Sequence, residues 1–152
     1  MNEILAKSPD HNDPSRLAEA WTDHYFLKTK KVVEKNGDKT VTYAVFMRRP
    51  VLFAPKIMVD WLHSVASKRE TRFKTDLNYK EGQWVGAGEP LLYITGPLSK
   101  LVDLETIYLQ KLGACCVAAN NAFSMCVELP NVGFLAMDAR HCAGLEMANM
   151  MA

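Results

Sequence analysis

The alternation of apolar and polar residues along the chain predicts short strands set between amphipathic helices. Residues 15–36 have helical spacing, and the capping pair Thr22-Asp23 inside them predicts a break near Thr22. Residues 40–48 alternate at every position, which predicts a strand with Val41, Tyr43, Val45 and Met47 on one face. The other expected elements are a helix over 57–67, strands over 71–78, 90–95 and 132–139, a long helix over about 99–127, and a helix from Leu145.

Turn and capping residues divide the chain into three parts and indicate the α+β class. Residues 1–13 are expected to be a loose leader, because Asp13-Pro14 is a helix start. Residues 14–130 contain the first strands and the long helix, whose apolar residues occupy more than one face, as in a helix buried between layers. Pro130 breaks the chain, and residues 131–152 form one further strand-helix unit.

Composition excludes several classes of protein. A chain of 152 residues with 49% hydrophobic residues is globular, yet it is too short for a closed (β/α)8 barrel of about 250 residues. Its 18 Lys+Arg against 17 Asp+Glu argue against nucleic-acid binding. It contains no apolar run of about 18 residues and no secretory signal, so we expect no membrane span. The cysteines fit no zinc spacing and indicate reduced, mostly buried thiols in a cytoplasmic protein: Cys115, Cys116, Cys126 and Cys142.

The segment Asp138-Ala139-Arg140-His141 carries the most informative chemistry. It follows the apolar run 132–139, and ligands in α/β proteins bind at the carboxyl ends of strands. Arg140 can hold a carboxylate or a phosphate with its two-pronged guanidinium, and His141 can hydrogen-bond the same anion. From the pattern alone, a structural alternative is equally good: Asp138 caps the next helix and Arg140 forms a surface ion pair.

Two further residues are weaker candidates by pattern. Arg48 lies at the end of the strand over 40–48, where a solvated charge is more common than an anion ligand. Tyr25 lies in an aromatic cluster, and such clusters more often belong to a core than to a ligand platform. Cys142 beside His141 leaves a small thiol-dependent protein as another hypothesis.

Several segments together resemble the nicotinate phosphoribosyltransferases, which are type II phosphoribosyltransferases related to the quinolinate enzymes. Thr22-Asp23-His24-Tyr25 resembles the family's Thr-Asp-x-Tyr, and Phe46-Met47-Arg48-Arg49-Pro50 resembles its Phe-Phe-Arg-Lys strand. The family's "GEPLL", "GPL" and "LET" segments match Gly88-Glu89-Pro90-Leu91-Leu92, Gly96-Pro97-Leu98 and Leu104-Glu105-Thr106. Ala139-Arg140-His141 and Gly144-Leu145-Glu146-Met147-Ala148 are similar to its Thr-Arg-Arg and Gly-x-Glu-x-Ala.

The resemblance implies a fold and an activity. It implies an N-terminal α/β sandwich-like domain over 14–130, followed by the first strand-helix unit of a truncated α/β barrel. The implied reaction joins nicotinate to phosphoribosyl pyrophosphate, giving nicotinate mononucleotide and pyrophosphate in NAD synthesis, with Mg²⁺ and ATP as cofactors. It also implies a homodimer with a shared active site.

By the same resemblance, Tyr25 stacks on the pyridine ring and Arg48 reaches a phosphate across the dimer interface. Arg140, with His141, contacts the carboxylate or phosphate of the substrate. The sequence departs from the family pattern at Met137-Asp138 and at His141, which leaves nicotinate, quinolinate and nicotinamide open as substrates. We expect the chain to be inactive alone, and a non-catalytic binding or assembly module is the competing function.

Overall fold

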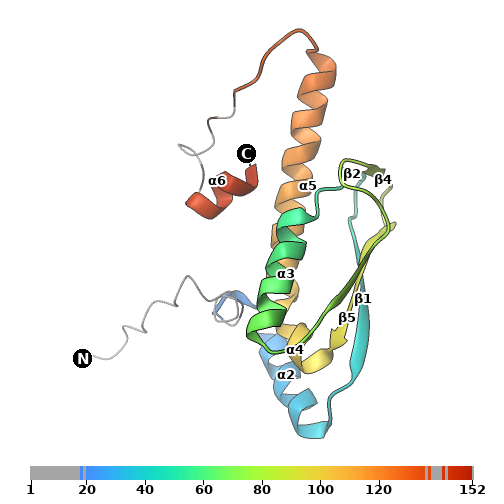
Figure 1. The fold of residues 1–152 in the computed structure, drawn as a ribbon, viewed down its shortest axis with the longest axis vertical. Helices are drawn as coiled ribbons and strands as arrows, with labels where there is room; N and C mark the ends of the chain where they lie inside the picture. The colour runs from blue at the N-terminus through green and yellow to red at the C-terminus, as the bar shows by residue number, and fades with distance from the viewer. Residues whose placement is uncertain (1–17, 19, 136, 138–141, 143, 152) are drawn as a thin grey trace, which may run out of the picture.

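The computed structural model describes residues 18, 20–135, 137, 142 and 144–151, and it has helices packed against one face of a small antiparallel sheet (Figure 1). The main sheet has the order β1-β5-β3, formed by β1 (Thr40–Phe46), β5 (Pro90–Pro97) and β3 (Lys74–Leu77). Both neighbours of β5 run antiparallel to it. The predicted α+β class is therefore confirmed.

The predicted alternation of β1 is confirmed by its burial. Val45 is buried and Tyr43 is half-buried, whereas Thr42 and Ala44, which alternate with them, are exposed. A second pairing was not predicted: β2 (Val51–Leu52) lies antiparallel to β4 (Trp84–Val85). Each of these strands has two residues, which is too short for an alternating pattern to be recognised.

The helices of the described chain mostly follow the predicted spacing. Their bounds are α2 (His24–Asn36), α3 (Lys56–Lys68), α4 (Leu98–Leu101), the 3-10 helix η1 (Val102–Leu104), α5 (Glu105–Glu128) and α6 (Leu145–Met151). The predicted break near Thr22 is confirmed, because helical Trp21 is followed by a bend at Thr22 and α2 begins at His24. The long helix expected over 99–127 is interrupted by η1, where Asp103 turns into the protein interior.

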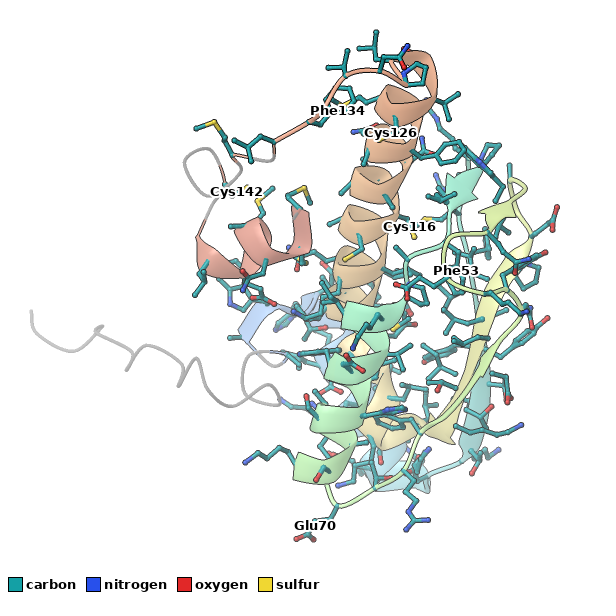
Figure 2. The ribbon with its side chains drawn as sticks, turned by 45° about the horizontal axis from the view of Figure 1, so that its top comes forward. Phe53, Glu70, Cys116, Cys126, Phe134 and Cys142 are labelled. Carbon is teal, nitrogen blue, oxygen red and sulfur yellow. The ribbon has the colours of Figure 1, made fainter. Side chains whose placement is uncertain are left out.

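The core lies between α3, α5 and the inner face of the sheet. Its fully buried side chains include Phe53, Leu62, Leu92, Leu104 and Leu112. Figure 2 shows Phe53 and Cys116 between the helices and the strands. In the part of the chain that the structure describes, no helix is long and apolar enough to cross a membrane.

The prediction that the long helix is buried holds for only half of α5. Its last buried residue is Cys116, and the outer half carries exposed Val117, Met125 and Val127. Figure 2 shows Cys126 and Phe134 far from Phe53 and the sheet. The main sheet ends before this part of α5, and a ring contact of Phe123 with Trp84 joins it to β4.

The strand expected over 132–139 does not form in its described residues. Residues 132–135 and 137 are in no strand, and Leu135 is 83% exposed. A parallel barrel strand needs neighbours to complete its hydrogen bonds, and none of the described strands lies beside this segment. The helix expected from Leu145 is confirmed as α6, which is joined to α5 by an ion pair between Glu146 and the buried Lys111.

Candidate functional site

The candidate site begins at the short bend that precedes α2. Asp23 is the N-cap residue of α2, and Tyr25 lies in the first turn. Tyr25 is 59% exposed, whereas the next residue, Phe26, is 8% exposed, and the centroids of the two rings lie 4.1 Å apart. Of the predicted aromatic cluster, Phe26 is the core residue and Tyr25 presents a ring to solvent.

The bend is tied to the beginning of α5. The Thr106 hydroxyl donates a hydrogen bond to Asp23 Oδ2 at 3.0 Å, and the backbone N–H of Asp23 donates to Thr106 Oγ1 at 3.3 Å. These residues are 83 positions apart in the sequence. Two of the segments that carry the family resemblance, 22–25 and 104–106, therefore meet in space.

Tyrosines and carboxylates gather at this junction. We define the tyrosine–carboxylate cluster as the residues joined by these hydrogen bonds or by their effect on one another's pKa: Asp23, Tyr25, Tyr43, Glu105, Thr106 and Tyr108. Burial and the charge of Asp23 raise the pKa of Glu105. Desolvation and the charges of Asp23 and Glu105 raise the pKa of Tyr25.

The two tyrosines on the inner side of the cluster respond to the same carboxylate. Burial raises the pKa of Tyr43, with a further contribution from the charge of Glu105. Burial also raises the pKa of Tyr108, which is 2% exposed, and Glu105 and Tyr43 add to the effect. The phenols therefore stay protonated at neutral pH, so the cluster combines neutral aromatic rings with negative charge.

Arg48 does not join this cluster. It is exposed on the bend that follows β1, five positions beyond Tyr43, or about 15 Å along an extended strand. In Figure 1, α2 lies near one end of β1, and β2 and β4 lie near the other. The structure thus separates Tyr25 from Arg48 within one chain.

Arg140 and His141 lie outside the described residues. Cys142 is half-buried and Cys126 is exposed, whereas Cys115 and Cys116 are buried. Two of the four thiols thus match the expectation of burial, and burial raises the pKa of both Cys115 and Cys116. Among the described residues, no group of three or more His, Cys, Asp or Glu side chains is placed to hold a metal ion.

Glu105 and Thr106 are members of the cluster that were not among the predicted site residues. The pattern of a long apolar helix gives no reason to select them. The available signal was the resemblance of Leu104-Glu105-Thr106 to a family segment, which spacing alone does not connect to Tyr25.

The comparison with protein families decides the family. Residues 23–116 match the family described as "Quinolinate phosphoribosyl transferase, N-terminal domain". The chain belongs to this quinolinate phosphoribosyltransferase family. The match includes the whole tyrosine–carboxylate cluster, from Asp23 to Tyr108. The predicted membership among type II phosphoribosyltransferases is therefore confirmed.

Solved structures support the same fold. The nicotinate-nucleotide pyrophosphorylase from Pyrococcus furiosus is 25% identical, with a TM-score of 0.52 over 78% of this chain and 31% of that chain. Human nicotinic acid phosphoribosyltransferase is 19% identical, with a TM-score of 0.58 over 75% of this chain and 30% of that chain. The nicotinate-nucleotide pyrophosphorylase from Ehrlichia chaffeensis is 13% identical, with a TM-score of 0.56 over 84% of this chain and 50% of that chain.

The chain covers at most half of the length of these similar structures. It spans 31%, 30% and 50% of their lengths, respectively. No curated protein matches its sequence. The fold of the N-terminal domain is thus established by the family match, while the activity of the whole enzyme is a matter for proposal.

Proposed function

We propose that this chain supplies the N-terminal domain of a phosphoribosyltransferase that acts on nicotinate. In the reaction, the ring nitrogen forms a bond to the anomeric carbon of phosphoribosyl pyrophosphate while the bond to pyrophosphate breaks. The products are nicotinate mononucleotide and pyrophosphate. The observation that carries the proposal is the exposed ring of Tyr25, held beside Asp23 and Glu105 within the matched domain.

Tyr25 has the properties of a platform for a flat heterocycle. The residue is 59% exposed, and the neighbouring Phe26 ring, tilted by 43°, limits the freedom of the Tyr25 ring. Offset stacking of two rings favours binding and fixes the plane of the substrate. Fixing the ring beside the reactive carbon lowers the entropic part of the barrier, so positioning is the contribution we assign to Tyr25.

Electrostatics favour nicotinate, which has one carboxylate, over quinolinate, which has two. Asp23 and Glu105 lie near enough to Tyr25 to raise the pKa of its phenol. Like charges in a partly desolvated site repel, and the repulsion grows with the number of carboxylates on the ligand. Quinolinate, whose reaction also releases carbon dioxide, is the second candidate, because the matching family is described by that substrate.

The proposal includes a homodimer with a shared site. Arg48 would serve the phosphate groups bound by a second copy of the chain, and its separation from Tyr25 within one chain supports this arrangement. We assign Arg140 and His141 to the carboxylate or phosphate of the substrate. Mg²⁺ and ATP belong to the proposed enzyme, and no step is assigned to them.

The test is a set of titrations of the chain with nicotinate, quinolinate and nicotinamide, followed by saturation-transfer NMR of the ligand protons. Nicotinate should bind more tightly than quinolinate, Tyr25→Phe should keep the affinity, and Tyr25→Ala should reduce it about fivefold. Tighter binding of quinolinate would select the second candidate. Equal binding by Tyr25→Ala and the wild type would remove Tyr25 from the site.

A reaction assay addresses the whole enzyme. The chain spans 30–50% of the solved structures described above, so we expect no mononucleotide when it is mixed with nicotinate, phosphoribosyl pyrophosphate, ATP and Mg²⁺. Chromatography with a mononucleotide standard makes the measurement. Formation of product by the chain alone would show that the catalytic machinery lies within these 152 residues.

A further inference from the structure

We propose that Thr106 is a positioning residue, whose hydroxyl fixes the bend before α2 and thereby sets the place of the Tyr25 ring. The inference rests on the proposed function, because it assigns to Thr106 a role in pyridine binding. Thr106 itself lies in the first turn of α5, on the other side of the junction from Tyr25.

The hydroxyl of Thr106 makes two bonds with one residue. It donates to the carboxylate of Asp23 at 3.0 Å and accepts from the backbone N–H of Asp23 at 3.3 Å. One bond alone would leave the bend free to rotate about it. The pair fixes both the side chain and the backbone of Asp23 relative to α5.

The local sequence would favour a different use of Asp23. An N-cap aspartate normally accepts a hydrogen bond from the first turn of its own helix. Asp23 has suitable extended backbone angles, with φ −63° and ψ 136°, yet its carboxylate makes no capping bond to the described N–H groups of α2. The carboxylate accepts a hydrogen bond from Thr106 instead, so Asp23 makes a contact with α5 in place of the usual capping bond within α2.

The position of Asp23 determines the position of Tyr25 through the backbone turn that they share. The backbone N–H of Phe26 donates to the carbonyl of Asp23 at 3.0 Å, which closes the turn that contains Tyr25. The Phe26 ring is buried and lies 4.1 Å from the Tyr25 ring. A shift of Asp23 therefore moves the turn and the exposed ring together.

The test compares Thr106→Val, Thr106→Ser and the control Thr42→Val in the full chain. Thr42 is a matched control because its hydroxyl is 2.8 Å from that of Thr95 on the exposed side of the sheet, outside the cluster. Tyrosine rings are labelled with ¹³C, and Tyr25→Phe assigns the Tyr25 signal. Three quantities are measured: the Tyr25 ring signal without ligand, the exchange rate of the Asp23 amide, and the dissociation constant for nicotinate.

We expect Thr106→Val to move the Tyr25 signal, to speed exchange of the Asp23 amide, and to weaken nicotinate binding by up to about fivefold, the loss expected when the Tyr25 ring is removed altogether. Thr106→Ser should stay within about twofold of the wild type because it keeps both hydrogen bonds, and Thr42→Val should leave all three quantities unchanged. A general loss of structure would move every tyrosine signal, whereas the positioning role moves that of Tyr25.

Two results would overturn the inference, and they can be told apart. If Thr106→Val keeps the Tyr25 signal and the nicotinate affinity of the wild type, Thr106 positions nothing. If the wild-type chain binds none of the pyridines, the proposed function fails and the positioning role fails with it. In the second case, amide exchange still shows whether the Thr106–Asp23 bonds exist.

Discussion

The buried carboxylate of Asp103 should be the most sensitive ionic group in the domain. It is 0% exposed and receives two bonds from Arg69, at 2.6 and 3.0 Å, and one from Lys30 Nζ at 2.8 Å. Lys30 belongs to α2, Arg69 follows α3, and Asp103 lies in η1. One carboxylate thus joins three elements, and Asp103→Asn tests how much the domain depends on it.

The expected loss follows from burial. Breaking a buried ion pair by removing the charge of one partner costs about 3–5 kcal/mol, since the other charge is left uncompensated in the interior. The side chain of Arg69 is 6% exposed, which places it in this class, whereas that of Lys30 is 20% exposed and can regain some water. We therefore expect the free energy of unfolding to fall by about 3 kcal/mol.

Urea unfolding at neutral pH, followed by circular dichroism, measures this loss. The matched control is Asp60→Asn, which removes the same charge from the Lys56–Asp60 pair on the surface of α3, where the side chains are 69% and 62% exposed. We expect the control to unfold as the wild type does, since exposed pairs contribute little. A loss for Asp103→Asn no larger than that of the control would refute the argument from burial.

The pH dependence gives a second check on the same carboxylate. Burial alone would raise the pKa of Asp103, but the hydrogen bonds and charges of Arg69 and Lys30 lower it on balance. A lowered pKa means that the contribution is present above the unfolded value of about 4 and is lost as the pH falls below it. The difference between the wild type and Asp103→Asn should therefore narrow in acid, and a constant difference would count against the assignment.

Three further predictions test local features. Glu70→Gly should stabilise the domain by about 0.5 kcal/mol in urea unfolding, because Glu70, two residues after the end of α3, has φ +50°, a conformation that favours glycine. A loss of stability would contradict this. Gly96→Ala should lower stability by about 2 kcal/mol in thermal unfolding, because its Cβ would lie 2.6 Å from the Phe73 ring. A thiol reagent should modify Cys126 and Cys142 in the folded chain. It should modify the buried Cys115 and Cys116 only when the chain unfolds.

Elements with a local cause were predictable from the sequence. The break before α2 follows from the capping pair at Thr22, and β1 follows from alternation over seven residues. The interruption of the long helix at η1 has no local cause, because Asp103 is drawn inward by Arg69 and Lys30 from other elements. Periodicity within one segment contains no information about such partners, so this feature required the structure.

The candidate site was predictable only in part for the same reason. The resemblance selected Tyr25, and the structure gives it an exposed ring beside two carboxylates. The residue that holds the bend in place, Thr106, is 83 positions away from Asp23. Its role is visible only after folding brings the first turn of α5 against the start of α2.

The outer half of α5 shows how composition and structure can disagree in an informative way. Residues 112–127 contain no Asp, Glu, Lys or Arg, and a helix without a charged face is typical of a buried position. Burial nevertheless ends at Cys116, which is also where the family match ends. The inner half follows the rule because the sheet and α3 cover it. An apolar sequence therefore indicates which residues would gain from burial, while the length of the neighbouring elements decides which of them are buried.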